Sequence, residues 1–183
     1  DALPISYICH PSMANNEISG IAVSTFLAKW ILKKKLKYTY RFLFLPETIG
    51  SIAYLSKKKD ILKKNTIAGY VLTCIGDDRN YSLLESKDKN SLSNYIAKSV
   101  LKTRKKAKIY DWLKRGSDER QYCSPGIDLP IASLMRTKYG EYPEYHTSLD
   151  KIGSVVTNKG LLGGLKLVKD VVNCIEMQTF PQS

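Results

Sequence analysis

The sequence predicts an α/β domain in which a mixed or largely parallel sheet is covered by helices on both faces. Three observations carry this prediction. Short apolar runs rich in β-branched and aromatic residues recur along the chain, amphipathic segments separate them, and 43% of the 183 residues are hydrophobic. Strands that alternate with helices need crossover connections, which place helices over both faces of the sheet. The length suits a single core, so we predict one domain over residues 1–183.

The first half of the chain alternates strand and helix. Residues 5–9 (ISYIC) are typical of a buried strand, and residues 17–35 carry apolar side chains at helical spacing, with Asn15 or Asn16 as the helix cap. The aromatic run 38–46 predicts a second strand that Pro46 ends. Residues 50–64 then predict a helix, and residues 66–76 predict a third strand.

The second half continues the alternation. We predict a short strand at 81–85, a basic amphipathic helix at 91–106, and strands at 107–113 and 130–136. The last helix should begin at Asn158 as its cap, with one apolar stripe formed by Leu161, Leu165, Val168, Val172 and Ile175. Sites in such sheets form where strands end, so the loops that follow the strands should carry the functional residues.

The net charge of +12 comes mainly from lysine clusters at 33–35, 57–59 and 102–106. Such a charge is one signature of a nucleic-acid surface. The clusters, however, fall at the ends of three separate expected helices, where cations face the helix dipole and stay solvated. Because no aromatic-interleaved basic motif accompanies them, we expect no nucleic-acid partner and keep such binding as the weaker alternative.

Four cysteines lie far apart with no C-x-x-C pair, as expected for reduced thiols in the cytoplasm. No window reaches the roughly 18 uninterrupted apolar residues of a membrane helix, so we expect no membrane partner. The chain lacks an initiator Met and runs directly into an apolar strand. We therefore expect a piece of a longer protein whose earlier strands are absent.

Both histidines stand in expected loops beside carboxylates and amides. His10 follows the first strand, and His146 lies in EYPEYHTSLD. A loop histidine is often only a hydrogen-bonded surface residue. A pair of them also allows a metal site, because neutral imidazole is a common ligand and a nearby Glu can act as general base toward metal-bound water. From residue types alone both interpretations stay open.

Four segments, in this order, resemble the site segments of the zinc aminopeptidase superfamily, which also contains the glutaminyl cyclases. They are HPSMANNEISG (10–20), FLPETIGS (44–51), GSDERQY (116–122) and EYHTSLD (144–150). They are most similar to a bacterial branch, the aminopeptidase-like domain of uncharacterised function associated with surface-polysaccharide genes. The similarity covers nearly the whole chain. It implies a three-layer sandwich whose mixed, mostly parallel sheet has helices on both faces.

The resemblance also implies roles for individual residues. His10 and His146 match the first and last histidine ligands of the superfamily. Glu47 matches the general base that takes a proton from the attacking water. Asn16 stands where the family carries a metal-bridging aspartate, and Asp118 matches a residue to which we assign a supporting role that orients the site.

Three anionic metal donors of the family pattern are missing. Asn16 is neutral, Thr48 stands where a second Glu would bind metal, and Thr73 or Cys74 occupies the stretch of a further Asp ligand. We therefore expect at most one ion, zinc, held by His10 and His146. Asn16, water or a nearby carboxylate would complete the coordination, with four candidates that the sequence does not rank: Asp77, Asp78, Asp118 and Glu141.

Other residues in these segments have two interpretations each. Arg120, Arg136 and Tyr145 are able to bind a substrate carboxylate or a tetrahedral oxygen, but they serve equally well to tie loops together. Cys9 precedes His10 directly. Since neighbours on a strand point to opposite faces, we expect no Cys-His dyad.

The leading hypothesis is a metal-dependent hydrolase of peptide or other amide bonds, similar to an aminopeptidase and acting on a peptide-like or small amide substrate. The alternative is a binding or scaffold protein that keeps the peptidase fold with a weakened or inactive site. The missing anionic donors favour this alternative. The resemblance favours the enzyme.

Overall fold

Six strands form one mixed sheet in the computed structural model, which describes residues 1–178. Along the sheet the strands follow the order β2-β1-β3-β6-β4-β5. Their bounds are β1 Ala2–Tyr7, β2 Leu43–Leu45, β3 Ala68–Leu72, β4 Tyr81–Leu84, β5 Ala107–Tyr110 and β6 Ile131–Met135.

Four neighbouring strands, β2, β1, β3 and β6, run parallel. Ile5 in β1 pairs with Leu43 on one side and Val71 on the other. β4 is antiparallel to β6, with Leu83 opposite Leu134, and β5 is parallel to β4. The parallel strands therefore all end at one edge of the sheet, and the loops that follow them meet there.

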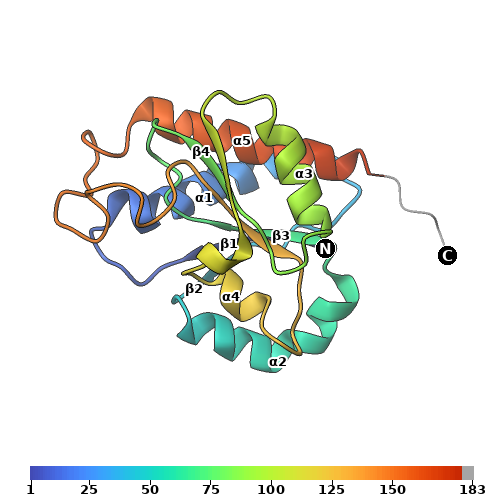
Figure 1. Cartoon of the computed structure of the whole chain (residues 1–183). Coiled ribbons are helices and arrows are strands. Elements are labelled where there is room, and N and C mark those ends of the chain that lie inside the picture. Colours follow the sequence, from blue (N-terminus) through green and yellow to red (C-terminus); the bar gives the residue numbers. More distant parts are fainter. Residues whose placement is uncertain (179–183) are drawn as a thin grey trace.

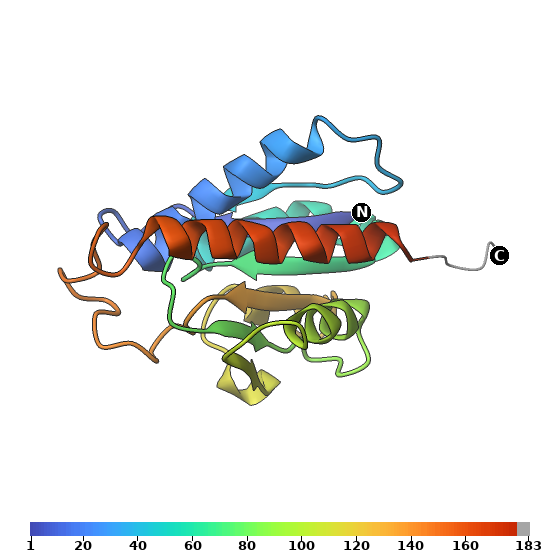
Figure 2. The same ribbon diagram turned by 90° about the horizontal axis from the view of Figure 1, so that it is seen from above.

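Helices cover both faces of the sheet (Figures 1 and 2). α1 (Ser19–Ile31), α3 (Leu92–Leu101) and α5 (Asn158–Glu176) pack on one face. α2 (Ile49–Asn65) and the short α4 (Glu119–Tyr122) pack on the other. The central strands β1, β3 and β6 are wholly buried, as continuous apolar runs predict. The three-layer α/β architecture expected from the sequence is confirmed.

Glycines let helices approach the strand ends closely. A Cβ at Gly20 of α1 would lie 2.2 Å from the Leu72 carbonyl oxygen, and one at Gly160 of α5 would lie 1.9 Å from the Gly76 oxygen. Only a residue without a side chain fits such contacts. The helix N-termini of α1 and α5 are therefore held against the loop after β3, next to the edge where the parallel strands end.

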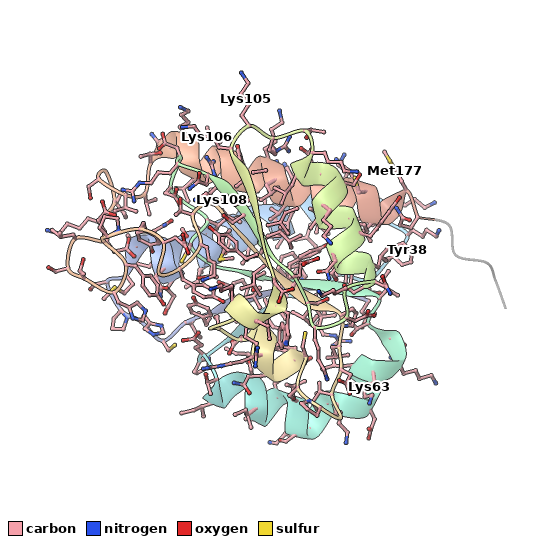
Figure 3. All side chains as sticks on the ribbon, viewed as in Figure 1. Tyr38, Lys63, Lys105, Lys106, Lys108 and Met177 are labelled. Carbon is pink, nitrogen blue, oxygen red and sulfur yellow. The ribbon has the colours of Figure 1, made fainter. Side chains whose placement is uncertain are left out.

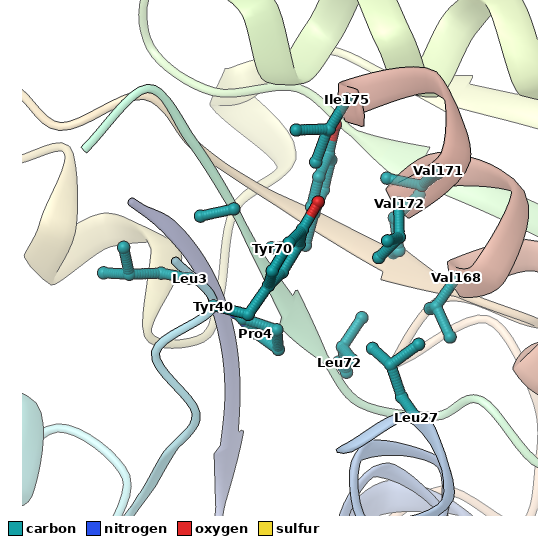
Figure 4. A pocket seen from close by; sticks show the side chains of 12 residues that line it. Leu3, Pro4, Leu27, Tyr40, Tyr70, Leu72, Val168, Val171, Val172 and Ile175 are labelled. Atoms are coloured by element: carbon teal, nitrogen blue, oxygen red, sulfur yellow. The ribbon is translucent and has the colours of Figure 1, made fainter. Parts of the chain in front are cut away.

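A small apolar cavity of about 20 Å³ lies between α5, α1 and the strands β1 and β3 (Figure 4). Tyr70 and Leu72 of β3 line it together with Val168 and Val172 of α5. A space of this size holds about one water molecule, and an apolar lining keeps such a space dry. It is too small for a substrate, so the chemistry must lie elsewhere.

Two predicted helix caps are wrong. Asn15 and Asn16 do not cap α1. They lie inside a π-helical turn, η1 (Ala14–Ile18), that precedes it and are buried there. The last helix is capped by Thr157 rather than Asn158, because the Thr157 hydroxyl accepts the Gly160 N–H at 2.9 Å.

Several element boundaries also differ from the prediction. The expected strand 38–46 is reduced to β2 and a bridge at Tyr40, whose hydroxyl donates to Glu176 at the end of α5. The expected helix 91–106 ends at Leu101, and the expected strand 107–113 gives way after Tyr110 to a 3₁₀ turn, η2 (Trp112–Lys114). α4 was not predicted. In the three segments 38–46, 91–106 and 107–113, the local sequence pattern extends further than the element that forms.

The lysines lie on separate parts of the surface. Lys105, Lys106 and Lys108 surround the connection from α3 to β5, whereas Lys63 projects from α2 on the opposite side (Figure 3). The cluster 57–59 lies within α2, not at its end. Among residues 1–178, no helix has the length and apolar character needed to cross a bilayer.

Candidate active site

The loops that follow β1, β2 and β3 meet the segment that follows β6 at one edge of the sheet. Cys9 and His10 follow β1, Glu47 and Thr48 follow β2, and Cys74 follows β3. The segment after β6 carries His146 back to the loop that leads into α1, and Figure 1 shows these two segments side by side. This is the edge at which the sheet topology predicts a site.

The structure brings His10, Glu47 and His146 together. The ring centroids of His10 and His146 are 5.4 Å apart, and His10 Nε2 lies 3.7 Å from Glu47 Oε2. The Tyr145 ring stacks on His146 with centroids 4.0 Å apart and an angle of 18° between the planes. Two imidazoles and one carboxylate thus face each other from three distant parts of the chain.

Glu17 holds the other side of the His10 ring. Its Oε2 atom lies 2.9 Å from His10 Nδ1 and also accepts the backbone N–H of His10. The other ring nitrogen, Nε2, lies on the Glu47 side.

Asp150 ties the two histidine loops together. Its carboxylate accepts the backbone N–H of Asn15 at 2.7 Å and of Asn16 at 3.0 Å, and its own carbonyl accepts the N–H of Ala14 at 3.2 Å. Asp150 is 1% exposed. It lies four residues after His146, so one buried side chain fixes the loop of His146 against the turn after His10. We did not predict this role from the sequence.

Asp118 and Ser117 hold the loop that carries Glu47. Ser117 donates its hydroxyl to Glu47 Oε1 at 2.7 Å. Asp118 accepts the Thr48 N–H at 2.7 Å and the Ser51 hydroxyl at 2.9 Å. Burial raises the pKa of Asp118 to about 6, and the nearby Glu47 charge contributes to this rise. The contacts agree with a supporting role for Asp118.

Backbone strain is concentrated in these loops. Thr48 has φ 63° and ψ −69°, Cys74 has φ 45°, and His146 has φ 56°. Residues with a Cβ rarely adopt a positive φ, least of all β-branched ones. Strain of this kind persists where surrounding contacts fix the chain, and it is frequent at functional sites.

The positions of the missing anionic donors are filled by neutral contacts. The Cys74 thiol lies 3.8 Å from Asn16 Oδ1, and the Thr73 hydroxyl donates to the Asn16 carbonyl at 2.6 Å. The Asn16 amide nitrogen is buried and has no hydrogen-bond partner among the described residues. The side-chain oxygen of Asn16 therefore faces the Cys74 thiol.

The residue types nevertheless suit a zinc ion. Two imidazoles lie near the carboxylate of Glu47, and imidazole nitrogen with carboxylate oxygen is a usual zinc combination. Cys9, His10 and Glu17 also have potential ligand atoms that lie within 4.8 Å of one another. Among the described residues this is the one group whose ligand atoms lie that close together, and it includes neither Glu47 nor His146.

The position of Cys9 shows that one expectation from the sequence is wrong, namely that Cys9 and His10 point to opposite faces. β1 ends at Tyr7, so Cys9 and His10 do not alternate as strand residues do, and Cys9 Sγ lies 3.3 Å from His10 Nδ1. Burial raises the pKa of the Cys9 thiol. The thiol therefore remains protonated near neutral pH, and this pair has no activated nucleophile.

Arg136 is not brought to the histidines. Its guanidinium donates to the carbonyls of Asn80 at 2.6 Å and Gly160 at 3.3 Å, and it lies over the Tyr81 ring. Among the two interpretations offered for Arg136, the geometry favours the one in which it ties loops together. Arg120 lies at the site margin, with Nη2 3.4 Å from Thr48 Oγ1.

The four remaining ligand candidates differ in their surroundings. Asp77 accepts hydrogen bonds from Thr137, Arg79 and Asn15, which occupy both of its carboxylate oxygens. Asp78 lies beside Lys159, and Glu141 is exposed on the surface. Only Asp118 among them lies next to the Glu47 loop, and its oxygens are engaged with Thr48 and Ser51.

The fold and this arrangement define an aminopeptidase-like α/β domain. Solved structures with the same fold include an aminopeptidase from Aneurinibacillus sp. strain AM-1, with 18% identity, a TM-score of 0.80, and coverage of 100% of this chain and 46% of that one. A zinc aminopeptidase from Bacillus subtilis is also similar, with 15% identity, a TM-score of 0.80, and coverage of 95% and 46%. At these identities the likeness shows the fold alone.

The chain belongs to the family described as Domain of unknown function (DUF4910), whose profile matches residues 1–178. A curated relative from Clostridium acetobutylicum carries the provisional name of a polysaccharide biosynthesis protein with an aminopeptidase-like domain. It is 43% identical over 178 residues, which cover 96% of this chain and 40% of the relative. A crystal structure of a protein provisionally called a peptidase, from the same organism, has a TM-score of 0.91 at 43% identity, with coverage of 96% and 41%. The chain therefore spans about 40% of the length of these relatives, and the resemblance inferred from the four motifs is confirmed.

Proposed function

We propose that this chain provides the catalytic site of a metal-dependent hydrolase of peptide or other amide bonds, similar to an aminopeptidase. One observation carries the proposal: His10 and His146, from loops far apart in sequence, face each other at 5.4 Å with Glu47 beside His10. The zinc aminopeptidases among the solved structures with this fold support it. The substrate would be a peptide-like or small amide compound, and the location cytoplasmic.

His10 and His146 would hold a single zinc ion. When bound, such an ion polarises the substrate carbonyl and lowers the pKa of its water toward neutrality. The His10 ring is prepared for this role, because Glu17 occupies Nδ1 and leaves Nε2 as the donor atom. Asn16, water or a carboxylate would complete the coordination.

Glu47 would act as the general base and then as the general acid. Its Oε1 accepts the Ser117 hydroxyl, so Oε2, which faces His10, is the oxygen available to take a proton from the attacking water. The same oxygen then delivers the proton to the leaving amine. Ser117 is 2% exposed, so the hydrogen bond that orients Glu47 is shielded from solvent.

Tyr145 would stabilise the tetrahedral intermediate. Its ring is fixed by stacking on His146, and burial raises the pKa of its hydroxyl above the ordinary value. The hydroxyl therefore stays protonated and can donate a hydrogen bond to a developing oxyanion. Arg120, exposed beside Thr48, is placed to meet a substrate carboxylate at the margin.

The test separates metal binding from catalysis. The intact protein should contain about one zinc ion per chain by metal analysis, and the double variant His10→Ala, His146→Ala should lose it while keeping its fold. Glu47→Gln should keep the ion but lower amide hydrolysis about 10²- to 10⁴-fold, because the base alone is removed. A folded wild-type protein without metal, or hydrolysis unchanged in Glu47→Gln, contradicts the proposal.

The binding or scaffold alternative rests on a specific observation: with Asn16, Thr48, and Thr73 or Cys74 at their positions, the site lacks three anionic donors of the family pattern. It predicts that the zinc-loaded protein binds amide compounds without cleaving them. A screen of aminoacyl and amide substrates with added zinc, cobalt or manganese distinguishes the two functions. Hydrolysis that depends on Glu47 excludes the alternative.

A further inference from the structure

Glu17 is a buried carboxylate beside the site, and the four motifs predicted no role for it. It is 5% exposed, and it follows Asn16, the neutral residue at the expected ligand position. We propose that Glu17 is a positioning residue: it fixes the His10 ring with the hydrogen on Nδ1 and so directs Nε2 to the metal. The part of this inference that concerns metal rests on the proposed function.

The π-helical turn explains how Glu17 reaches His10. The N–H of Ile18 bonds to the carbonyl of Met13, five residues earlier, and the N–H of Ser19 bonds to that of Ala14 in the same way. A π-turn takes one residue more than an α-turn, so it rotates the following side chains relative to an α-helix. In this chain the turn buries Glu17 beneath the loop of His10.

Two contacts make the positioning specific. Glu17 Oε2 accepts the backbone N–H of His10 and lies 2.9 Å from His10 Nδ1, so a single oxygen contacts both the main chain and the ring of one residue. A carboxylate bonded to the distal nitrogen of a ligating histidine sets its tautomer and raises its basicity. Glu17 thus supplies a carboxylate behind the His10 ring, whereas Asn16 and Thr48 are neutral residues at two expected ligand positions.

The same atoms allow a competing arrangement. Cys9, His10 Nδ1 and Glu17 lie within 4.8 Å of one another and could themselves surround an ion. In that case Glu17 would be a ligand, and Nδ1 would carry no hydrogen. The two arrangements differ in which ring nitrogen is protonated in the metal-free protein and in whether the Cys9 sulfur contacts the metal.

The first experiment compares Glu17→Gln with wild type in the intact protein. Glu85→Gln is the matched control, because Glu85 is also a buried glutamate, 8% exposed, and its ion-pair partner is Lys98 rather than a histidine. Zinc affinity is measured by competition with a chelating dye. We expect Glu17→Gln to bind zinc about 10- to 100-fold more weakly and Glu85→Gln to match wild type. Equal affinity in Glu17→Gln overturns the inference.

The second experiment reads the ring nitrogens of metal-free protein by ¹H–¹⁵N NMR, with His10 assigned by its loss in His10→Ala. We expect neutral His10 to carry its hydrogen on Nδ1 in wild type and to lose this preference in Glu17→Gln. A hydrogen on Nε2 in wild type overturns the inference. This measurement needs no metal, so a protein that fails to bind zinc would refute the proposed function while the tautomer still decides the role of Glu17.

Cobalt(II)-loaded protein tests the competing arrangement. Positioning by Glu17 predicts a spectrum without thiolate-to-cobalt charge transfer, unchanged in Cys9→Ser. A charge-transfer band that disappears in Cys9→Ser would show the ion on the Nδ1 side and overturn the inference.

Discussion

Removal of the Asp150 side chain should destabilise the protein more than any exposed change. In Asp150→Ala, the N–H groups of Asn15 and Asn16 lose their acceptor while both residues stay buried, at 0% and 1% exposure. A buried donor left without a partner costs about 1–3 kcal/mol. Two such donors give a loss of about 2–6 kcal/mol, a large share of the roughly 5–15 kcal/mol of a typical domain.

Urea unfolding of metal-free protein measures this loss. We expect a lower midpoint with an unchanged m-value, because the unfolded surface is the same. Asp60→Ala, an exposed change on α2, is the control and should stay within about 0.5 kcal/mol of wild type. A loss below about 1 kcal/mol in Asp150→Ala would refute the reasoning, since it would mean that water or a shifted loop satisfies both donors.

Two further predictions concern the Glu47 loop. The pKa of Asp118 is raised from its ordinary 3.8 to about 6 in the folded protein. Between about pH 4 and 6 the folded protein therefore keeps a proton on Asp118 that the unfolded chain has released. The free energy of unfolding should fall by about 3 kcal/mol as the pH rises through this window. Asp118→Asn should lack that fall in urea titrations with chelator present; equal slopes in both proteins would contradict the assignment. Thr48→Gly should stabilise the fold by about 1 kcal/mol in thermal melts because it relieves the positive φ of 63°, whereas Thr48→Ala should give no gain. Destabilisation by glycine would show that the loop is not strained.

The layers of this fold could be predicted because each depends on local pattern. The apolar runs that became β1, β3 and β6 are buried on both faces, which a continuous hydrophobic segment already indicates. Element ends were less predictable. The segment 38–42 has strand-like composition, yet its Tyr40 is anchored to Glu176 by a contact that links opposite ends of the sequence. Local propensity carries no information about such a partner.

The site was predictable only where a motif marked it. His10, Glu47 and His146 were found through the resemblance, and residue types alone left two interpretations open. Glu17 and Asp150 stood within the quoted motifs but were missed, because the sequence does not show which groups their carboxylates contact. The adjacent asparagines before Glu17 suggested a helix cap, whereas both lie in a π-turn with their N–H groups bonded to Asp150. Arg136 is the opposite case: the sequence offered it as a candidate to bind substrate, but its guanidinium packs on the Tyr81 ring.

The outer strand β5 gives the surface lysines a second physical meaning. It is four residues long, and Lys105, Lys106 and Lys108 are exposed on and beside it. A strand at the border of a sheet offers unpaired peptide groups to any passing extended chain. The lysines on and beside β5 repel the same lysines of a second molecule. Because β5 is short, pairing between the two strands would also form few hydrogen bonds. The positive charge that suggests a polyanionic partner therefore also acts as a barrier against growth of the sheet into an aggregate.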